Sequence, residues 1–561
     1  MNNLFGRTRD ASRQILAPFA PASETVSDRI AALLAHYGRR DLSVAHELCD
    51  RHDPARVGYR LVAKDLSVEE LTYATLRAES ERFAGVLKNL GVKPGDRVAT
   101  LMGKSREYLI ALLGIWRMGA VQVPLFTAFA APAVEIRLTG SGAKVAIGDG
   151  DQIDKVTTKG VIKISTGPAS ASAENFEALM RRATPHTKRA ALGGDAPLIE
   201  IFTSGTTGAP KGVVVPSKAL GCFVGYGEFA LALTPDSSFW NAADPGWAYG
   251  LYYGILVSLA MGVPSVLLKA GFDASLTLAV LQKLQVTDFA AAPTVYRSIR
   301  VSGVAVPRLP NLKRLSSAGE PLTPDIIDWS REQLGCVVHD HYGQTETGML
   351  INNHHLPSLE RPLRSGSMGI VMPGWRGAVL KMDADAPAPV GELGRVAINL
   401  AESPFSWFKG YRNAPPSKTK EKYSADGRWY VTGDTAQTDE DGMFYFRARD
   451  DDVIIMAGYR IGPFEVESVL ATHPAVAESA VVAAPDEVRG EVLQAFVVTR
   501  DGFEPSAALE ADLKHLVKTK FAAHAFPRKV HFVSALPKTA SGKVQRFVLR
   551  QQLAAEAARK G

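Results

Sequence analysis

Cysteine is scarce in this sequence. Only three of the 561 residues are cysteines, Cys49, Cys222 and Cys336, and they lie far apart. The sequence holds no CxxC pair and no second cysteine near any of the three. Disulfide frameworks and structural zinc sites need closely spaced ligands, so neither is expected, and a reducing compartment is the default.

Long apolar runs are also missing. No stretch reaches the roughly 18 apolar residues that a membrane helix needs. The first residues, MNNLFGRTRDASRQILAPF, lack the compact apolar core of a secretory signal, although their arginines leave an organelle transit peptide open. We therefore expect a cytoplasmic protein without a membrane span.

Concentrated charge of one sign is absent as well. The 64 basic and 58 acidic residues leave a formal net charge of +6, and no lysine or arginine tract stands out. Such a diffuse excess suits anionic small molecules and gives no reason to expect a nucleic acid as partner.

The residues that are present suit a large globular α/β protein. With 46% hydrophobic and 22% charged residues, the chain has apolar material for more than one domain. Short β-branched runs alternate with amphipathic segments, the pattern of parallel α/β sheets. We expect strands at 97–102, 143–149, 197–202, 262–268 and 286–293, and a helix at 105–121.

The pattern changes near residue 427. Alternating strands flank a turn predicted at Asp441 and Gly442, and residues 462–486 suggest a helix, a turn and a strand. We place a domain boundary near the acidic run 450–452, which taken alone is also compatible with a solvated turn. The predicted fold class is α/β, with a large N-terminal body of parallel and mixed sheets, residues 1–450, and a small α+β module, residues 451–561.

The stretch TSGTTGAPKG runs from Thr203 to Gly212, directly after the strand expected at 197–202. Its glycines let backbone N–H groups turn toward oxygens, its hydroxyls add donors and Lys211 adds a positive charge, so it suits phosphate binding. It does not match the loop GxxxxGK followed by serine or threonine, because Lys211 lies between Pro210 and Gly212. Taken alone, an exposed flexible turn remains an alternative.

Six short blocks together point to one family. They are TSGTTGAPKG, SSAGEPL (316–322), YGQTETG (342–348), YVTGD (430–434), RARDDDVIIMAGYRIGPFEVE (447–467) and PKTASGKVQR (537–546). In this order they resemble the adenylate-forming acyl-CoA synthetases, and the tail blocks look most like those of acetyl-CoA and medium-chain acyl-CoA synthetases. The resemblance runs from about residue 70 to the end of the chain.

This resemblance implies a reaction and an architecture. A large N-terminal AMP-binding domain and a small, mobile C-terminal domain would convert a carboxylic acid, ATP and coenzyme A into an acyl-CoA, AMP and pyrophosphate through an acyl-adenylate. ATP, Mg²⁺ and coenzyme A are the implied cofactors and substrates.

The implied chemistry needs positive charge at the α-phosphate, because a carboxylate must attack a polyanion. Lys543 matches the family lysine that bridges the carboxylate and the α-phosphate. Glu346 matches the magnesium ligand, and Thr345 fits a contact to the α-phosphate. Without the resemblance, a surface lysine and a helix-capping or salt-bridged glutamate would be the ordinary interpretations.

The resemblance also implies a nucleotide pocket. Asp434 matches the acceptor of the ribose hydroxyls, Arg449 a second ribose contact and Arg460 a phosphate contact, while Tyr342 is placed against the adenine. The residues implied for ATP and AMP are Thr203, Ser204, Gly205, Thr206, Thr207, Gly208, Lys211, Gly319, Glu320, Pro321, Tyr342, Gln344, Asp434, Arg449 and Arg460.

The small domain is implied to rotate between the two half-reactions, presenting first Lys543 and then a loop for coenzyme A. Asp451 aligns with the family hinge, and hinges absorb a large backbone change in few residues. Gly458 aligns with the loop along which the pantetheine arm passes.

The acyl pocket is implied at Trp247, Ala248, Tyr249, Ala318 and Gly343. An indole takes the place of Gly343 in acetate-specific relatives, so glycine there predicts added room, and each buried CH₂ contributes about 0.8 kcal/mol. We expect a short- to medium-chain aliphatic acid. Tyr249 leaves alternatives open, since its ring could refill that room or its hydroxyl could bind a polar acid.

Other functions remain open at this stage. They are an acetate- or aromatic-acid–CoA ligase, an adenylating enzyme with a carrier-protein acceptor, and a nucleotide-binding relative without chemistry. Decay of the chemistry should show as a lost Lys543, Glu346 or Asp434, and all three are present. The expected partners are a small carboxylic acid, ATP and coenzyme A, and the protein is expected to be a monomer or a homodimer.

Overall fold

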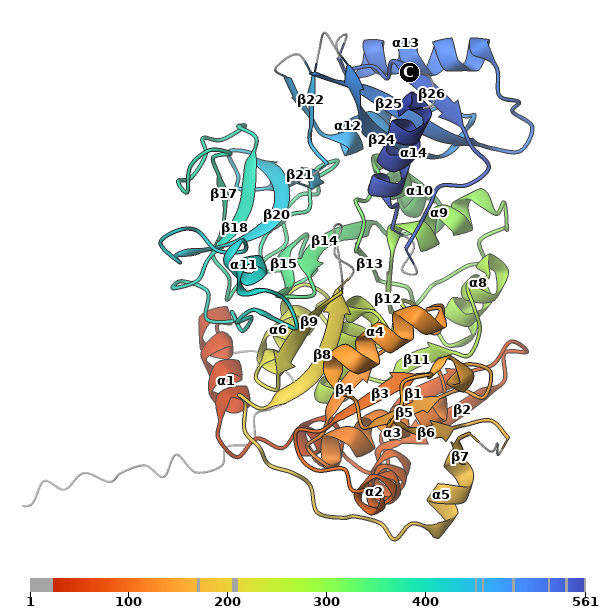
Figure 1. The fold of residues 1–561 in the computed structure, drawn as a ribbon, viewed down its shortest axis with the longest axis vertical. Coiled ribbons are helices and arrows are strands. Elements are labelled where there is room, and N and C mark those ends of the chain that lie inside the picture. Colours follow the sequence, from red (N-terminus) through yellow and green to blue (C-terminus); the bar gives the residue numbers. More distant parts are fainter. Residues whose placement is uncertain are drawn as a thin grey trace, which may run out of the picture.

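The computed structural model describes residues 24–168, 172–203, 210–449, 452–456, 459–486, 490–522, 525–539 and 543–558. Figure 1 shows a large body, coloured from red to cyan, and a smaller blue unit at one end of the long axis. No helix among the described residues has the length and apolar character that crossing a membrane requires.

An eight-stranded sheet forms one part of the body. Its central strands are parallel and buried, as expected for strands that are covered on both faces. Strand β9 runs antiparallel to β8 and pairs Lys211 with Thr203, which brings together the two ends of the glycine-rich stretch. In spatial order the strands are β19 (Tyr411–Arg412), β9 (Lys211–Pro216), β8 (Pro197–Thr203), β4 (Val121–Pro124), β3 (Arg97–Leu101), β5 (Val145–Gly148), β6 (Ile162–Ser165) and β7 (Glu174–Asn175).

A nine-stranded sheet forms a second part of the body. Its strands β13 and β14 are parallel, with Ala318 opposite His341, so their carboxyl ends lie side by side. In spatial order the strands are β16 (Ile370–Val371), β15 (Gly348–Asn352), β14 (Val338–Gln344), β13 (Arg314–Ala318), β12 (Asp288–Ala291), β10 (Phe239–Asn241), β11 (Ser265–Leu268), β1 (Val57–Val62) and β2 (Val68–Thr72).

A four-stranded antiparallel sheet completes the body. Its strands are β17 (Gly377–Leu380), β18 (Gly394–Asn399), β20 (Trp429–Thr438) and β21 (Phe444–Arg449). The turn predicted at Asp441 and Gly442 is confirmed, with Gly442 at a φ of 76° between β20 and β21. In this hairpin Asp434 lies opposite Arg449.

The C-terminal unit has a hydrophobic core of its own, which includes Ile454, Phe496 and Leu553. The predicted smaller C-terminal domain is thus confirmed, whereas the boundary proposed at 450 and 451 lies outside the described residues. Its strands and helices are β22 (Ile454–Met456), β23 (Tyr459–Ile461), α12 (Pro463–Leu470), β24 (Val476–Asp486), β25 (Gly490–Thr499), α13 (Ala507–Lys520), β26 (Lys529–Phe532) and α14 (Arg546–Ala558).

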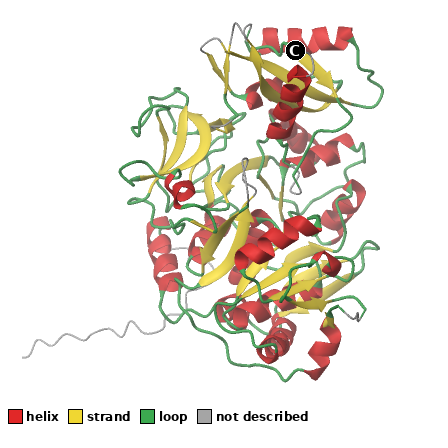
Figure 2. Ribbon diagram, in the orientation of Figure 1, coloured by secondary structure: helices red, strands yellow, loops and turns green. Residues whose placement is uncertain are grey.

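Helices surround the two large sheets (Figure 2). They are α1 (Val26–Gly38), α2 (Tyr73–Asn89), α3 (Arg106–Arg117), α4 (Ala131–Ser141), α5 (Phe176–Arg182), α6 (Ala219–Phe229), α7 (Ser258–Met261), α8 (Ala274–Lys283), α9 (Pro293–Val301), α10 (Pro324–Gln333) and α11 (Pro416–Lys420), with the helical segments η1 (His46–Asp50), η2 (Ile153–Lys155) and η3 (Gly250–Val257).

The predicted strands are confirmed, since four of the runs contain β3, β5, β11 and β12, and the run 197–202 covers all of β8 except Thr203. The helix predicted over 105–121 is too long, because α3 ends at Arg117. Gly119 has a φ of 69°, in the left-handed region that commonly terminates helices, and the chain then starts β4 at Val121.

Candidate active site

Two parallel strands deliver predicted site residues to one edge of the nine-stranded sheet. Strand β13 leads into Gly319 and Glu320, and β14 carries Tyr342, Gly343 and Gln344 at its end. Open α/β sheets bind ligands at the carboxyl ends of such strands. The blocks SSAGEPL and YGQTETG therefore meet, as the resemblance implied.

Asp434 is firmly held beside this edge. The Tyr342 hydroxyl and the Gln344 amide each donate a hydrogen bond of 2.6 Å to Oδ2 of Asp434. Nη1 of Arg449 lies 3.6 Å from its Oδ1. The residue is only 4% exposed, so these contacts orient the carboxylate before a ligand arrives. Burial, assisted by Asp434, raises the pKa of Tyr342 well above its usual value and keeps the phenol a donor.

Glu346 lies in the turn between β14 and β15 and is 8% exposed. The Tyr411 hydroxyl donates to its Oε1 at 2.7 Å, while Oε2 accepts no hydrogen bond from the described residues. The Tyr252 hydroxyl donates to the carbonyl oxygen of Thr345 at 3.2 Å. The Lys211 ammonium lies 5.0 Å from the centre of the Tyr411 ring, so the end of the glycine-rich stretch reaches Glu346 through Tyr411.

Gly319 allows a close approach to Trp247. Its φ is 105°, and a Cβ there would lie 2.2 Å from the Trp247 ring, so only glycine fits. The neighbouring Glu320 pairs with Arg297, whose Nη2 lies 2.6 Å from Oε2, and its Oε1 accepts a hydrogen bond from the Thr294 hydroxyl.

The C-terminal unit brings Lys543 to the same place. Its Nζ lies 5.5 Å from the centre of the Trp247 ring. The backbone N–H of Lys543 donates to Oγ1 of Thr539 at 3.1 Å, which anchors the base of the side chain. The side chain is exposed as a whole, yet protein atoms around its end desolvate the ammonium and lower the pKa of Lys543, and Arg449 acts in the same direction. Glu320, Asp434 and Glu346 favour the charged form.

The predicted acyl-pocket residues lie together but leave little space in this conformation. Tyr249 is 2% exposed, Ala318 is fully buried, and the Trp247 and Tyr249 ring centres are 5.8 Å apart. A Cβ on Gly343 would lie 2.3 Å from the carbonyl oxygen of Gly348, so no side chain fits between this position and strand β15. The glycine therefore allows a tight strand pairing.

A chain of buried polar groups lies behind Tyr249. Its hydroxyl is 3.5 Å from that of Tyr226, and the Tyr226 hydroxyl is 2.7 Å from Nδ1 of His341. Nε2 of His341 lies 3.0 Å from the carbonyl oxygen of Asn353, which can only accept, so Nε2 carries the proton and Nδ1 accepts from Tyr226. This network fixes the position of the Tyr249 ring.

Two family models match the chain. Residues 52–411 match the model described as AMP-binding enzyme, which is more than half of the 561 residues. Residues 465–543 match the model described as AMP-binding enzyme C-terminal domain. The chain belongs to the AMP-binding enzyme family.

Known relatives of this AMP-binding enzyme align along nearly their whole length. Acetyl-coenzyme A synthetase of Bacillus subtilis (strain 168) is 34% identical over 527 residues, which cover 91% of this chain and 90% of the relative. The protein in the crystal structure of Brucella canis acyl-CoA synthetase is 41% identical in sequence to this chain. The match covers 96% of this chain and 98% of that one, with a TM-score of 0.73. The anthranilate CoA ligase AuaEII, whose structure was solved in complex with anthranoyl-AMP, is 27% identical in sequence to this chain. The match covers 95% of this chain and 100% of that one, with a TM-score of 0.85. The predicted resemblance, fold class and AMP-forming ligase class are confirmed.

Some of the residues predicted for this AMP-binding enzyme lie outside the described part of the chain. They are residues 204–208 of the glycine-rich stretch, the hinge residue Asp451, Gly458 and the side chain of Arg460. Their roles stay predictions from the resemblance.

Motif comparison missed two side chains beside the residues implied for the nucleotide, Tyr411 and Lys422, which lie between the recognised blocks. Tyr411 binds Glu346, as described above, and the Lys422 ammonium donates to the carbonyl oxygen of Thr432 at 2.7 Å. Folding brings both to this candidate site, because β19 pairs with β9 and because Lys422 contacts β20.

A histidine cluster was also not predicted. Ring nitrogens of His339, His341 and His355 lie within 4.8 Å of one another. The carbonyl oxygen of Asn353 lies 2.9 Å from Nδ1 of His339, and burial lowers the pKa of His339 to about 4. The His339 and His355 rings stack with centres 3.7 Å apart. These rings are neutral, stack on one another and donate to carbonyl oxygens. The histidine cluster therefore has a role in packing and hydrogen bonding at β14.

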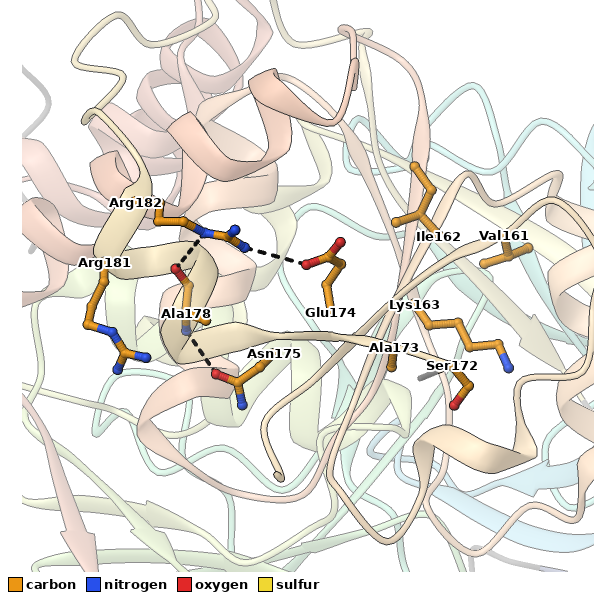
Figure 3. A pocket seen from close by; sticks show the side chains of 10 residues that line it. All are labelled: Val161, Ile162, Lys163, Ser172, Ala173, Glu174, Asn175, Ala178, Arg181 and Arg182. Atoms are coloured by element: carbon orange, nitrogen blue, oxygen red, sulfur yellow. Dashed lines mark hydrogen bonds and ion pairs between the residues drawn. The ribbon is translucent and has the colours of Figure 1, made fainter. Parts of the chain in front are cut away.

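A cavity of about 700 Å³ lies between β6, β7 and α5, at the far edge of the eight-stranded sheet. Figure 3 shows the side chains that line it. Lys163, Arg181 and Arg182 line it, and Arg182 forms an ion pair of 3.5 Å with Glu174. None of the predicted site residues lines this cavity, so it is separate from the candidate active site.

Proposed function

We propose that this AMP-binding enzyme is an acyl-CoA synthetase that activates a small carboxylic acid with ATP and transfers the acyl group to coenzyme A. The observation that carries the proposal is that Lys543 of the small domain lies 5.5 Å from the Trp247 ring, which packs against Gly319 at the end of β13. A cation delivered to a nucleotide pocket is what the first half-reaction needs.

In the first half-reaction a carboxylate oxygen of the acid bonds to the α-phosphorus of ATP. The bond from that phosphorus to the bridging oxygen breaks, and pyrophosphate leaves with the electron pair. Both reactants are anions, so their repulsion raises the barrier. The proposed role of the Lys543 ammonium is to contact both and offset that repulsion, with Thr345 close to the α-phosphate.

Asp434 is proposed to accept hydrogen bonds from the ribose hydroxyls. Its Oδ2 already accepts from Tyr342 and Gln344, which prevents rotation of the carboxylate and fixes Oδ1 beside Arg449. A fixed acceptor loses little entropy when the nucleotide binds.

Glu346 fits a magnesium site in its donor chemistry. One carboxylate oxygen is held by Tyr411 and the other accepts nothing from the described residues, and Mg²⁺ commonly takes one or two carboxylates together with waters and phosphate oxygens. When bound there, Mg²⁺ would reduce the negative charge of the phosphates. Tyr411 would hold the carboxylate in the orientation needed.

In the second half-reaction the sulfur of coenzyme A attacks the acyl carbon, AMP leaves and the thiol proton passes to solvent. The small domain is proposed to turn about Asp451 and present Gly458 to the pantetheine arm. In the present arrangement the two parts are joined by an ion pair in which Nη1 of Arg447 on β21 lies 2.8 Å from Oε1 of Glu465 on α12. A half-exposed pair of this kind contributes little and can exchange its partners.

We place the preferred acid at the short end of the predicted short- to medium-chain range. Tyr249 and Ala318 have almost no exposed surface, and strand β15 occupies the space beside Gly343. A longer aliphatic or aromatic acid would need Tyr249 to move. The cytoplasmic location and the oligomeric state stay predictions.

The test is pyrophosphate exchange into ATP across acids from acetate to decanoate, with benzoate included, followed by addition of coenzyme A. The proposal predicts no exchange without an acid, a maximum at a short acid, and release of AMP with acyl-CoA when coenzyme A is added. Exchange without an acid, or an adenylate that reacts only with a carrier protein, would overturn it.

A further inference from the structure

Lys422 lies at the nucleotide site without an acidic partner. Its ammonium donates to the Thr432 carbonyl at 2.7 Å and forms no ion pair with any described carboxylate. The centre of the Tyr430 ring is 5.9 Å away. Burial lowers the pKa of Lys422, while Glu346 and Asp434 favour the charged form. An ammonium has three donor protons, so a half-buried one with a single carbonyl acceptor lacks partners.

A second cation borders the same space. A Cβ placed on Gly433 would lie 3.3 Å from Nζ of Lys422 and 3.7 Å from Nη2 of Arg449. Gly433 has a φ of 81°, which disfavours any side chain, so both cations approach the backbone here without a side chain between them. Two cations at the same backbone position repel each other, and the carboxylate of Asp434, 3.6 Å from Arg449, offsets part of that repulsion.

We propose a phosphate subsite beside Gly433, in which Lys422 binds the phosphate chain of ATP next to Arg449, the implied ribose contact. Lys422 interacts electrostatically with Asp434, the proposed ribose acceptor, with Glu346, the proposed magnesium ligand, and with Lys211 at the end of the glycine-rich stretch. Phosphate oxygens are strong acceptors and supply the partners that the ammonium lacks. Lys422 lies outside the six family blocks, so the resemblance assigns it no role.

The inference shares one premise with the proposed function, namely that ATP binds beside Asp434. Its test compares the affinities of the full-length protein for ATP and for adenosine, which lacks phosphate, by calorimetric titration. The variants are Lys422→Met, which keeps the aliphatic stem, and Lys422→Arg, which keeps the charge. Lys420→Met is the matched control, because Lys420 is exposed two residues earlier.

We expect Lys422→Met to weaken ATP binding about tenfold and to leave adenosine binding within about twofold of the original. Lys422→Arg should recover most of the loss, and Lys420→Met should behave as the unaltered protein. Unchanged ATP affinity in Lys422→Met, or an equal loss for adenosine, overturns the subsite.

Thermal melting of each variant reports folding. If Lys422→Met melts early, Lys422→Gln replaces it, since the glutamine amide can still donate to Thr432 while lacking the charge. Should the unaltered protein activate no acid, the proposed function fails, yet the ATP and adenosine comparison still decides the subsite.

Discussion

The ammonium nitrogen of Lys543 lies 5.5 Å from the centre of the Trp247 ring. Trp247 in turn packs against Gly319 in the block that is implied to form the adenine wall, and against Tyr249 in the implied acyl pocket. One side chain of the small domain thus reaches the point where the implied nucleotide and acyl regions of the large body meet. The proposed adenylate formation calls for such an arrangement, because a cation must contact both anionic reactants.

The first half-reaction should lose rate at alkaline pH because Lys543 must carry its proton. Desolvation lowers the pKa of Lys543 below its usual value of about 10.5, so the charged fraction falls as pH rises through that lowered value. We expect kcat/KM for ATP in acid-dependent pyrophosphate exchange to decline on the alkaline side, since this parameter reports the free enzyme.

Lys543→Arg provides the control for this pH profile. A guanidinium keeps its proton throughout the range, so the residual activity of this variant should lack the alkaline decline. The same decline in both proteins would show that another group is titrating.

Asp434→Asn should raise the KM for ATP by about 10- to 100-fold, because hydrogen bonds to a charged acceptor are worth about 1.5–3 kcal/mol. The KM for the acid should change little. Asp441→Asn is the control, since Asp441 is exposed on the same β20–β21 hairpin. An unchanged KM for ATP would remove Asp434 from the ribose site.

Tyr249→Ala should shift the preferred acid toward longer chains. The ring is buried and belongs to the implied acyl pocket, and each added CH₂ that enters the vacated space should favour binding about fourfold. Tyr249→Phe keeps the ring and should keep the original preference. The acid panel measures both variants, and an unaltered profile in Tyr249→Ala would place the acyl pocket elsewhere.

Local sequence patterns located the strands of this fold because β-branched runs suffice to define buried strands such as β3 and β12. The end of α3 was not predicted, because a glycine inside an apolar run does not reveal its φ. The structure shows that the chain turns at Gly119, which has a positive φ. Motifs placed Tyr342, Gln344 and Asp434 in one nucleotide site, and these three do form hydrogen bonds with one another.

Other features depend on contacts between distant segments. The close approach of the β15 backbone to Gly343 follows from the hairpin register, which the sequence alone does not show. Lys422 belongs to no motif and becomes a candidate only when β20 brings Thr432 and Gly433 to its ammonium. The tyrosine and histidine chain behind Tyr249 likewise joins residues more than 100 positions apart.

The most direct test of the account separates the two half-reactions in Lys543→Ala. Removing one preorganised charge at a developing transition state commonly costs about 10²–10³ in rate. We predict a loss of that size in acid-dependent pyrophosphate exchange, with near-normal acyl-CoA formation from supplied acyl-adenylate and coenzyme A. Equal loss in both halves, or full exchange activity without the ammonium, would contradict the role given to Lys543.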